Sequence, residues 1–291
     1  MSNMANSTEL EPREILRTTQ LIDTHTHFDV PEFDHDRAEQ SALAYQQGIR
    51  HLVLIGYLAK YFPQMLACQT QMASFPLAPK AHLAFGLHPF YILEHSEADL
   101  LQLEQFIQGY PSVAIGEIGL DTFTDEMKIA ENYAKQQDFF IKQLDLAKTY
   151  NLPALLHIRK AHGDTLKILK AEKFKNGGIA HSFSGGIQEA KAFVSLGFKI
   201  GITGQVTNPN AKKLRNTLVE LVKTVGLDSI VIETDCPDFT PACCHASHGR
   251  RNVPANLVYV LDELSVLLDV EKSQLIPILW QNSLSALKLN E

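Results

Sequence analysis

The sequence has no long hydrophobic run. Residues 1–20 are polar and mixed in charge, and no later window is apolar over the roughly 20 residues that a bilayer span needs. We therefore expect neither a signal peptide nor a membrane segment, and we expect a cytoplasmic protein with no membrane partner. We interpret residues 1–20 as an N-terminal extension and residues 21–291 as one domain, because no repeat, low-complexity tract or Pro/Gly-rich linker divides them.

Cysteine and positive charge are also scarce. The four cysteines are too few and too irregularly spaced for a disulfide framework in 291 residues, so we expect reduced thiols. Lys and Arg together number 26 against 33 Asp and Glu, which gives a net charge of -7. This balance excludes the broad basic face of a protein that wraps duplex nucleic acid, so any such contact must be local.

Strand and helix patterns alternate along the chain. Because parallel strands need helical crossovers, eight such units in roughly 250 residues predict an α/β fold, a (β/α)₈ TIM barrel. Neither G-x-G-x-x-G nor a Walker sequence is present, which argues against an open nucleotide-binding sheet, and we expect no organic cofactor. The predicted strands are residues 21–27, 49–56, 81–87, 113–119, 152–157, 178–181, 198–203 and 229–235. The predicted helices are residues 37–48, 60–75, 97–109, 125–150, 163–175, 187–196, 210–225, 254–268 and 273–287.

Residues of metal-ligand type follow these strands. The first strand ends in His25-Thr26-His27, and side chains two apart on a strand point to the same side. Imidazole suits zinc, iron, copper or nickel, and added carboxylates also suit manganese. In a barrel, all carboxyl ends of the strands surround one mouth, where such enzymes place their active sites. The further residues there are His88, Glu117, His157, His181 and Asp235, which suit two divalent ions sharing a carboxylate.

Each of these residues also has a structural interpretation. A histidine after an apolar run is as often a hydrogen-bonded rim residue as a ligand. Glu117 differs, because a carboxylate within the apolar run IGEIG would be costly unless something cationic meets it. Ligand-type residues on several separate strand ends are harder to attribute to chance than any one of them.

Taken in order, these motifs resemble the TatD family of metal-dependent deoxyribonucleases, in the amidohydrolase-like barrel superfamily. The resemblance covers residues 21–287 and rests on IDTHTHFD (22–29), GLHP (86–89), GEIGLD (116–121), LHIR (156–159), HSFSG (181–185), IGITG (200–204), ETDCP (233–237) and RNVPAN (251–256). It implies a two-metal phosphodiesterase. His25, His27 and Asp235 would hold one ion, His157 and His181 the other, and Glu117 would bridge them.

The resemblance also suggests roles for neighbouring residues. Asp235 and Glu117 are the candidate catalytic groups, with Asp235 orienting the attacking water and shuttling its proton. Glu233 is expected behind a ligating histidine, on the same side of the strand as Asp235, with a structural ion pair as the alternative. Donors to the substrate phosphate are expected from the loops, namely His88, Arg159, Ser182, Ser184 and Arg251, although each could be a solvated rim residue.

The function expected from the sequence is a hydrolase that cleaves DNA phosphodiesters, as a 3′–5′ exonuclease on single-stranded or frayed ends, with DNA as a transient substrate. One alternative is hydrolysis of a lactone, cyclic amide or small phosphate ester on the same barrel. Another is a non-catalytic metal-binding scaffold. Zinc or manganese is favoured and magnesium is possible, while the oligomeric state is left open with a monomer slightly favoured.

Cys243-Cys244-His245, followed by His248, departs from the family pattern. These residues could hold zinc, but no second pair with C-x-x-C spacing exists elsewhere in the chain. We favour a substrate-facing loop with reduced thiols, whose sequence leaves the substrate preference open.

Overall fold

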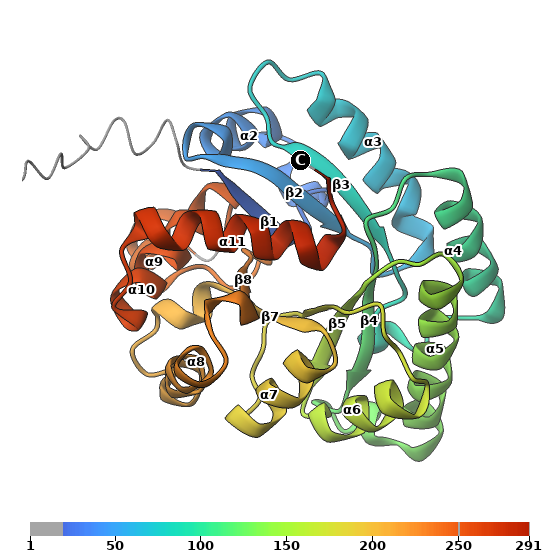
Figure 1. Ribbon diagram of the computed structural model, residues 1–291. Coiled ribbons are helices and arrows are strands. Elements are labelled where there is room, and N and C mark those ends of the chain that lie inside the picture. The colour runs from blue at the N-terminus through green and yellow to red at the C-terminus, as the bar shows by residue number, and fades with distance from the viewer. Residues whose placement is uncertain (1–19, 250, 291) are drawn as a thin grey trace, which may run out of the picture.

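A computed structural model describes residues 20–249 and 251–290, so most of the expected N-terminal extension lies outside the described residues. Eight parallel strands form one sheet in the order β1 to β8, each paired with its neighbour in sequence (Figure 1). The strands are β1 (Leu21–Thr26), β2 (Ile49–Ile55), β3 (Lys80–Phe85), β4 (Ala114–Asp121), β5 (Ala154–Arg159), β6 (Gly178–Ala180), β7 (Phe198–Ile202) and β8 (Ile230–Ile232).

The sheet curls until its first and last strands meet just beyond β8. The Asp235 N–H donates to the His25 carbonyl at 2.8 Å, and the His27 N–H donates to the Cys236 carbonyl at 2.9 Å. These two bonds bring the chain after β8 alongside the end of β1. The predicted TIM barrel is therefore confirmed.

Helices surround the barrel, and the last of them, α11, lies across one of its ends (Figure 1). They are α2 (Arg37–Gln46), α3 (Phe62–Ala73), α4 (Glu97–Gly109), α5 (Ala130–Thr149), α6 (His162–Ala171), α7 (Ile187–Ser195), α8 (Lys212–Thr224), α9 (His245–His248), α10 (Leu257–Leu268) and α11 (Lys272–Leu287). None of the helices in the described ranges is long and apolar enough to cross a membrane.

Most predicted elements are confirmed with shifted ends. The single helix predicted over residues 125–150 is wrong in its first turn, because Ile129 has an extended ψ of 131° and separates the 3₁₀ helix Glu126–Lys128 from α5. Strand β8 ends at Ile232 rather than at residue 235, because its pairing with β7 ends at Ile202 and the φ of +53° at Asp235 takes the chain out of the extended conformation.

Two hydrophobic layers hold the barrel. Alternate strand residues point inward, as the period of two requires, and include Ile22, Val53, Leu155 and Val231, all buried. The opposite faces pack against the helices in a larger apolar layer. Helix α11 closes the N-terminal end of the barrel, where Asn282 Nδ2 donates to the carbonyls of Leu227 and Ile230 at 2.8 Å. The C-terminal end is left for the site.

Candidate metal centre

A cavity of about 950 Å³ lies at the carboxyl ends of the strands. Its inner wall carries the residues of ligand type that the sequence placed at strand ends, and its outer wall carries aromatic and polar loop residues. The ligand-type residues on its lining are His27, His88, Glu117, His157, His181 and Asp235, with His25 buried beneath them. Tertiary structure therefore gathers all of these predicted positions into one site.

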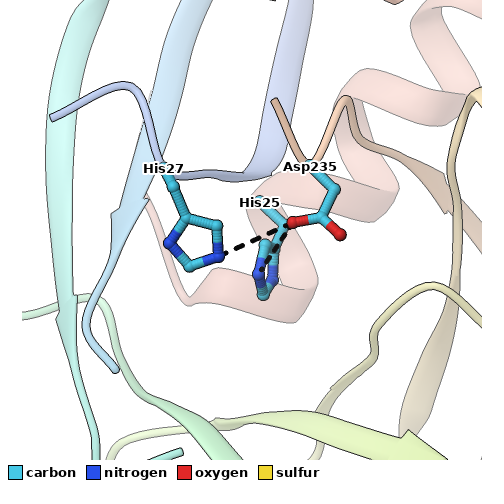
Figure 2. A group of neighbouring side chains, drawn as sticks. All are labelled: His25, His27 and Asp235. Carbon is cyan, nitrogen blue, oxygen red and sulfur yellow. Dashed lines mark ion pairs between the residues drawn. The ribbon is translucent and has the colours of Figure 1, made fainter. Parts of the chain in front are cut away.

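The H-x-H pair at the end of β1 faces Asp235. His25 Nε2 and His27 Nε2 lie 3.7 and 3.6 Å from the same oxygen, Asp235 Oδ1 (Figure 2). The two rings meet edge to face, with centroids 5.4 Å apart. Because the three donor atoms converge on one point, these residues form one group able to hold a cation.

Glu117 lies at the centre of the cluster. Its Oε2 is 3.2 Å from His25 Nε2, and its Oε1 is 2.8 Å from His157 Nδ1. Burial would raise the pKa of this carboxyl, but the imidazoles around it, with His88 and His25 contributing most, hold the pKa well below its usual range. The carboxylate is thus ionised and has one oxygen directed to each half of the cluster, as a bridging ligand would.

A carboxylate behind each of two histidines decides which ring nitrogen faces the centre. His157 Nε2 lies 2.9 Å from Asp121 Oδ2, and His181 Nδ1 lies 2.9 Å from Glu233 Oε1. Since each carboxylate takes the proton-bearing nitrogen as a donor, the lone pair of the other nitrogen is directed inward. His157 Nδ1 and His181 Nε2 are therefore the atoms available to a cation.

The raised pKa of His157 shows that the carboxylates around it favour positive charge at this position. Burial would lower it, but hydrogen bonds to Asp121 and Glu117 raise the pKa to about 9. A proton between His157 Nδ1 and Glu117 Oε1 occupies the position that a divalent cation would take. Ligand protons and metal compete for such positions.

His25 provides the clearest test of fit to a metal. It is 1% exposed, and among the described residues its Nδ1 has no hydrogen-bond partner, while its Nε2 faces the carboxylates of Glu117 and Asp235 without an aligned hydrogen bond. Its ring stacks on His181, with centroids 3.4 Å apart. Burying an imidazole without an aligned hydrogen bond is costly, and a cation between its Nε2 and these carboxylates would offset that cost. His27 fits as well, because its Nδ1 bonds the Ile55 carbonyl at 3.2 Å and so leaves Nε2 free to ligate.

His88 lies in the cluster but presents a donor. The Phe90 N–H donates to His88 Nδ1 at 3.0 Å, so the proton of the neutral ring must be on Nε2. Burial, with His157 nearby, lowers the pKa of His88 to about 4, which keeps the ring neutral. Its Nε2–H lies 3.4 Å from Glu117 Oε1 and 3.1 Å from His157 Nδ1. This tautomer suits donation to a substrate oxygen and not coordination.

Glu233 and Asp235 approach His181 from opposite sides. Asp235 Oδ2 lies 3.1 Å from His181 Nε2, whereas Glu233 lies at Nδ1. The expectation that both carboxylates share one strand face is wrong, because β8 ends at Ile232 and Asp235 has φ +53°. Glu233 is completely buried and also accepts the Ser182 N–H at 2.6 Å. Gly201 makes room for it, since a Cβ there would lie 2.4 Å from Glu233 Oε1.

The expected phosphate donors divide into two groups. His88, Arg159, Ser182 and Ser184 all line the cavity. Arg251 is not among the lining residues. Its guanidinium forms an ion pair with Asp36 and donates to the Glu32 carbonyl at 2.8 Å. The geometry therefore gives Arg251 a role in fixing the loop before α2 and no contact with the cavity.

Sequence reasoning missed several residues of the site. Asp121 is one of them, although its place at the end of β4 is the same signal that identifies the other residues. The aromatic residues Tyr57, Tyr91 and Phe239 line the outer cavity, and nothing in their local sequence marks them.

Among the described side chains, the cysteine loop adds no ligand group. All four cysteines are free, with Cys243 exposed and Cys244 buried. The groups of possible metal ligands among the described side chains, which exclude that of His248, contain neither cysteine.

Comparison with known proteins yields consistent similarities. A family profile for TatD-related DNases matches residues 22–288. The uncharacterized metal-dependent hydrolase YjjV of Escherichia coli K12 is 37% identical over 247 residues, covering 84% of this chain and 90% of YjjV. The uncharacterized metal-dependent hydrolase YabD of Bacillus subtilis is 31% identical over 271 residues, covering 93% and 100%. The crystal structure of E. coli YjjV, a TatD homologue, superposes with a TM-score of 0.82 at 33% identity, covering 93% of this chain and 98% of that one.

Proposed function

Since the chain belongs to the TatD-related DNase family of metal-dependent hydrolases, we propose that it cleaves the phosphodiester bonds of DNA. We propose further that it acts as a 3′–5′ exonuclease on single-stranded or frayed ends. The observation that carries this proposal is the convergence of five imidazoles on the buried, ionised Glu117, with Asp235 beside them, at the base of an open cavity.

The donor set fits two divalent ions. His25, His27 and Asp235 would hold one, His157 and His181 the other, with Glu117 between them. Ions bound there supply Lewis acidity, which makes water a nucleophile near neutral pH and offsets the charge of a phosphate. Zinc or manganese suits these nitrogen-rich ligands best, and the test described below also includes magnesium.

The protein's own groups position the reactants. Asp235 orients the attacking water and accepts its proton, because its carboxylate faces the centre and its lowered pKa keeps it ionised despite burial. The His88 Nε2–H donates to a phosphate oxygen, and its Nδ1 bond to Phe90 prevents the ring from rotating away. The Ser182 and Ser184 side chains meet the remaining phosphate oxygens, and Arg159 lines the same cavity further out along β5.

The charge distribution favours a strand end over a duplex. The protein carries a net charge of -7, so attraction to DNA must come from the site and from the few cations beside it. A positively charged contact confined to the site suits transient binding and release of DNA. A single strand would enter the cavity from its open side.

The test is cleavage of labelled DNA by protein loaded separately with zinc, manganese or magnesium. We expect progressive shortening of single-stranded DNA from its 3′ end and little attack on blunt duplex. Glu117→Ala and Asp235→Asn should abolish cleavage. Asp145→Asn, which changes an exposed carboxylate on α5, should have wild-type activity.

A panel of lactones, cyclic amides and small phosphate esters is incubated in parallel. Turnover of that panel without DNA cleavage would replace the proposal by the alternative hydrolase. Retention of DNA cleavage in both variants would show that the site is assigned wrongly, and no turnover of any substrate with any metal would favour the scaffold.

A further inference from the structure

Two cations at the end of β5 lie over one aromatic ring beside the cavity. Arg159 Cζ is 3.4 Å, and Lys160 Nζ 4.8 Å, from the centroid of the Phe123 ring. Arg159 lines the cavity. Within the described part of the chain neither cation forms an ion pair with a carboxylate, although acidic residues outnumber basic ones in this protein. Adjacent, unneutralised positive charges held together in this way form a site for an anion.

The backbone fixes the ring relative to the cations. The Thr122 N–H donates to the Arg159 carbonyl at 3.0 Å, and Thr122 Oγ1 donates to the Lys160 carbonyl at 3.1 Å. These bonds continue the pairing of β4 with β5, in which Asp121 lies opposite Arg159. Phe123 is consequently held against both cations, although the residue is 44% exposed.

The same segment is tied to the metal-ligand cluster through Asp121. One oxygen of this carboxylate accepts the Phe123 N–H at 2.7 Å, and the other lies 2.9 Å from His157 Nε2. A single buried carboxylate thus sets the distance between the aromatic ring and His157. The cations occupy a fixed position relative to the reacting centre, as the second contact point of one ligand would require.

The chemistry of this position suits phosphate. A guanidinium stacked on a ring keeps its edge N–H groups free, and that edge matches two oxygens of a phosphate. Arg159 follows His157 by two residues on an extended strand, which places its Cα about 7 Å further out along β5. A phosphate at Glu117 is therefore not the one that both cations meet.

We propose that Phe123, Arg159 and Lys160 form a subsite for the phosphate that flanks the scissile phosphodiester in a nucleic-acid strand. This inference rests on the proposed phosphodiesterase function. It predicts that substrates carrying a second phosphate bind better than a simple diester, and that this preference depends on the Phe123 ring and on the Lys160 charge.

The test compares the dinucleotide TpT with pTpT and TpTp, which carry an additional 5′ or 3′ phosphate, and with bis(p-nitrophenyl) phosphate. Wild-type protein should have a KM about tenfold lower for one phosphorylated dinucleotide than for TpT, because a charge-assisted phosphate contact is gained. Which of the two is preferred gives the polarity of the strand. In Phe123→Leu and Lys160→Gln that preference should shrink about threefold to fivefold, while kcat/KM for bis(p-nitrophenyl) phosphate stays unchanged.

Matched controls separate the subsite from general effects. Phe123→Tyr keeps a ring and should retain the preference. Lys167→Gln removes one positive charge from an exposed position on α6, where Lys167 pairs with Asp164, and should behave as wild type. Raising the ionic strength should reduce the preference in wild type more than in Lys160→Gln.

Binding of the same dinucleotides to the Glu117→Ala variant, measured by calorimetry, distinguishes failure of the subsite from failure of the proposed function. A tighter complex with pTpT or TpTp that weakens on adding Lys160→Gln supports the subsite even if no hydrolysis is found. Equal affinity for all three dinucleotides, or a preference that survives both Phe123→Leu and Lys160→Gln, would overturn it even if the protein cleaves DNA.

Discussion

Replacing Asp121 by Asn should weaken metal binding without removing any ligand. The Asp121 carboxylate is 1% exposed and lies 2.9 Å from His157 Nε2. In Asp121→Asn the amide oxygen can still accept the Phe123 N–H, but the amide nitrogen faces His157 and can only donate. His157 must then place its proton on Nδ1, which blocks the atom that faces Glu117.

The magnitude follows from the bond that is lost. A buried hydrogen bond to a charged group contributes about 1.5–3 kcal/mol. This corresponds to a loss of metal affinity of about tenfold to a hundredfold, in the range typical for partners behind metal-bound histidines. The loss should affect one ion of the pair, because His25 and His27 do not contact Asp121.

Competition with a chromophoric chelator measures the two affinities directly. Asp125→Asn is the matched control, since it changes an exposed carboxylate four residues away that pairs with Lys128. Unfolding in the presence of chelator shows whether the variant is folded. If Asp121→Asn binds both ions as wild type does, or if Asp125→Asn loses as much affinity, the tautomer argument is refuted.

Two further predictions concern packing and pH. Gly201→Ala should cost about 1–3 kcal/mol in urea unfolding and also weaken metal binding, because the new methyl group would lie 2.4 Å from Glu233 Oε1 and displace it; unchanged affinity would exclude Glu233 as a support for His181. His82, buried and bonded to His51 at 2.8 Å, has its pKa lowered to about 3 by burial. The unfolded chain therefore takes up a proton at His82 below about pH 6.5 that the folded state does not, and this group should by itself lower the unfolding free energy by about 2 kcal/mol between pH 7 and pH 5. In His82→Gln the change in unfolding free energy over that range should differ from wild type by about this amount, and an identical pH slope in the variant would contradict the assignment.

Local sequence patterns were sufficient for the barrel. The apolar runs of β2 and β3 and the helical spacing of α4 and α7 appear in the sequence within one or two residues of their observed ends. Such patterns depend on the period of the backbone, and each is contained within about ten residues. The patterns failed where the end of an element depends on its partner in the sheet. Strand β8, for example, ends where its pairing with β7 ends.

The sequence predicted which residues form the site but not the contacts that each of them makes. Barrel geometry places the carboxyl ends of all strands at one mouth, so His25, Glu117 and His181 could be expected together before any coordinates. Arg251 shows the limit of that inference. It lies on a loop of the right sequence, but Asp36, 215 residues away along the chain, holds its guanidinium.

The sequence by itself determined the fold, the set of ligand-type residues and the family to which the chain belongs. Only the tertiary structure decided which atom of each residue faces the centre: Phe90 makes His88 a donor, Asp121 exposes the lone pair of His157, and Glu233 does the same for His181. The physical reason is that periodicity is a property of neighbouring residues, whereas the tautomer of a buried imidazole depends on a single contact between groups that folding brings together.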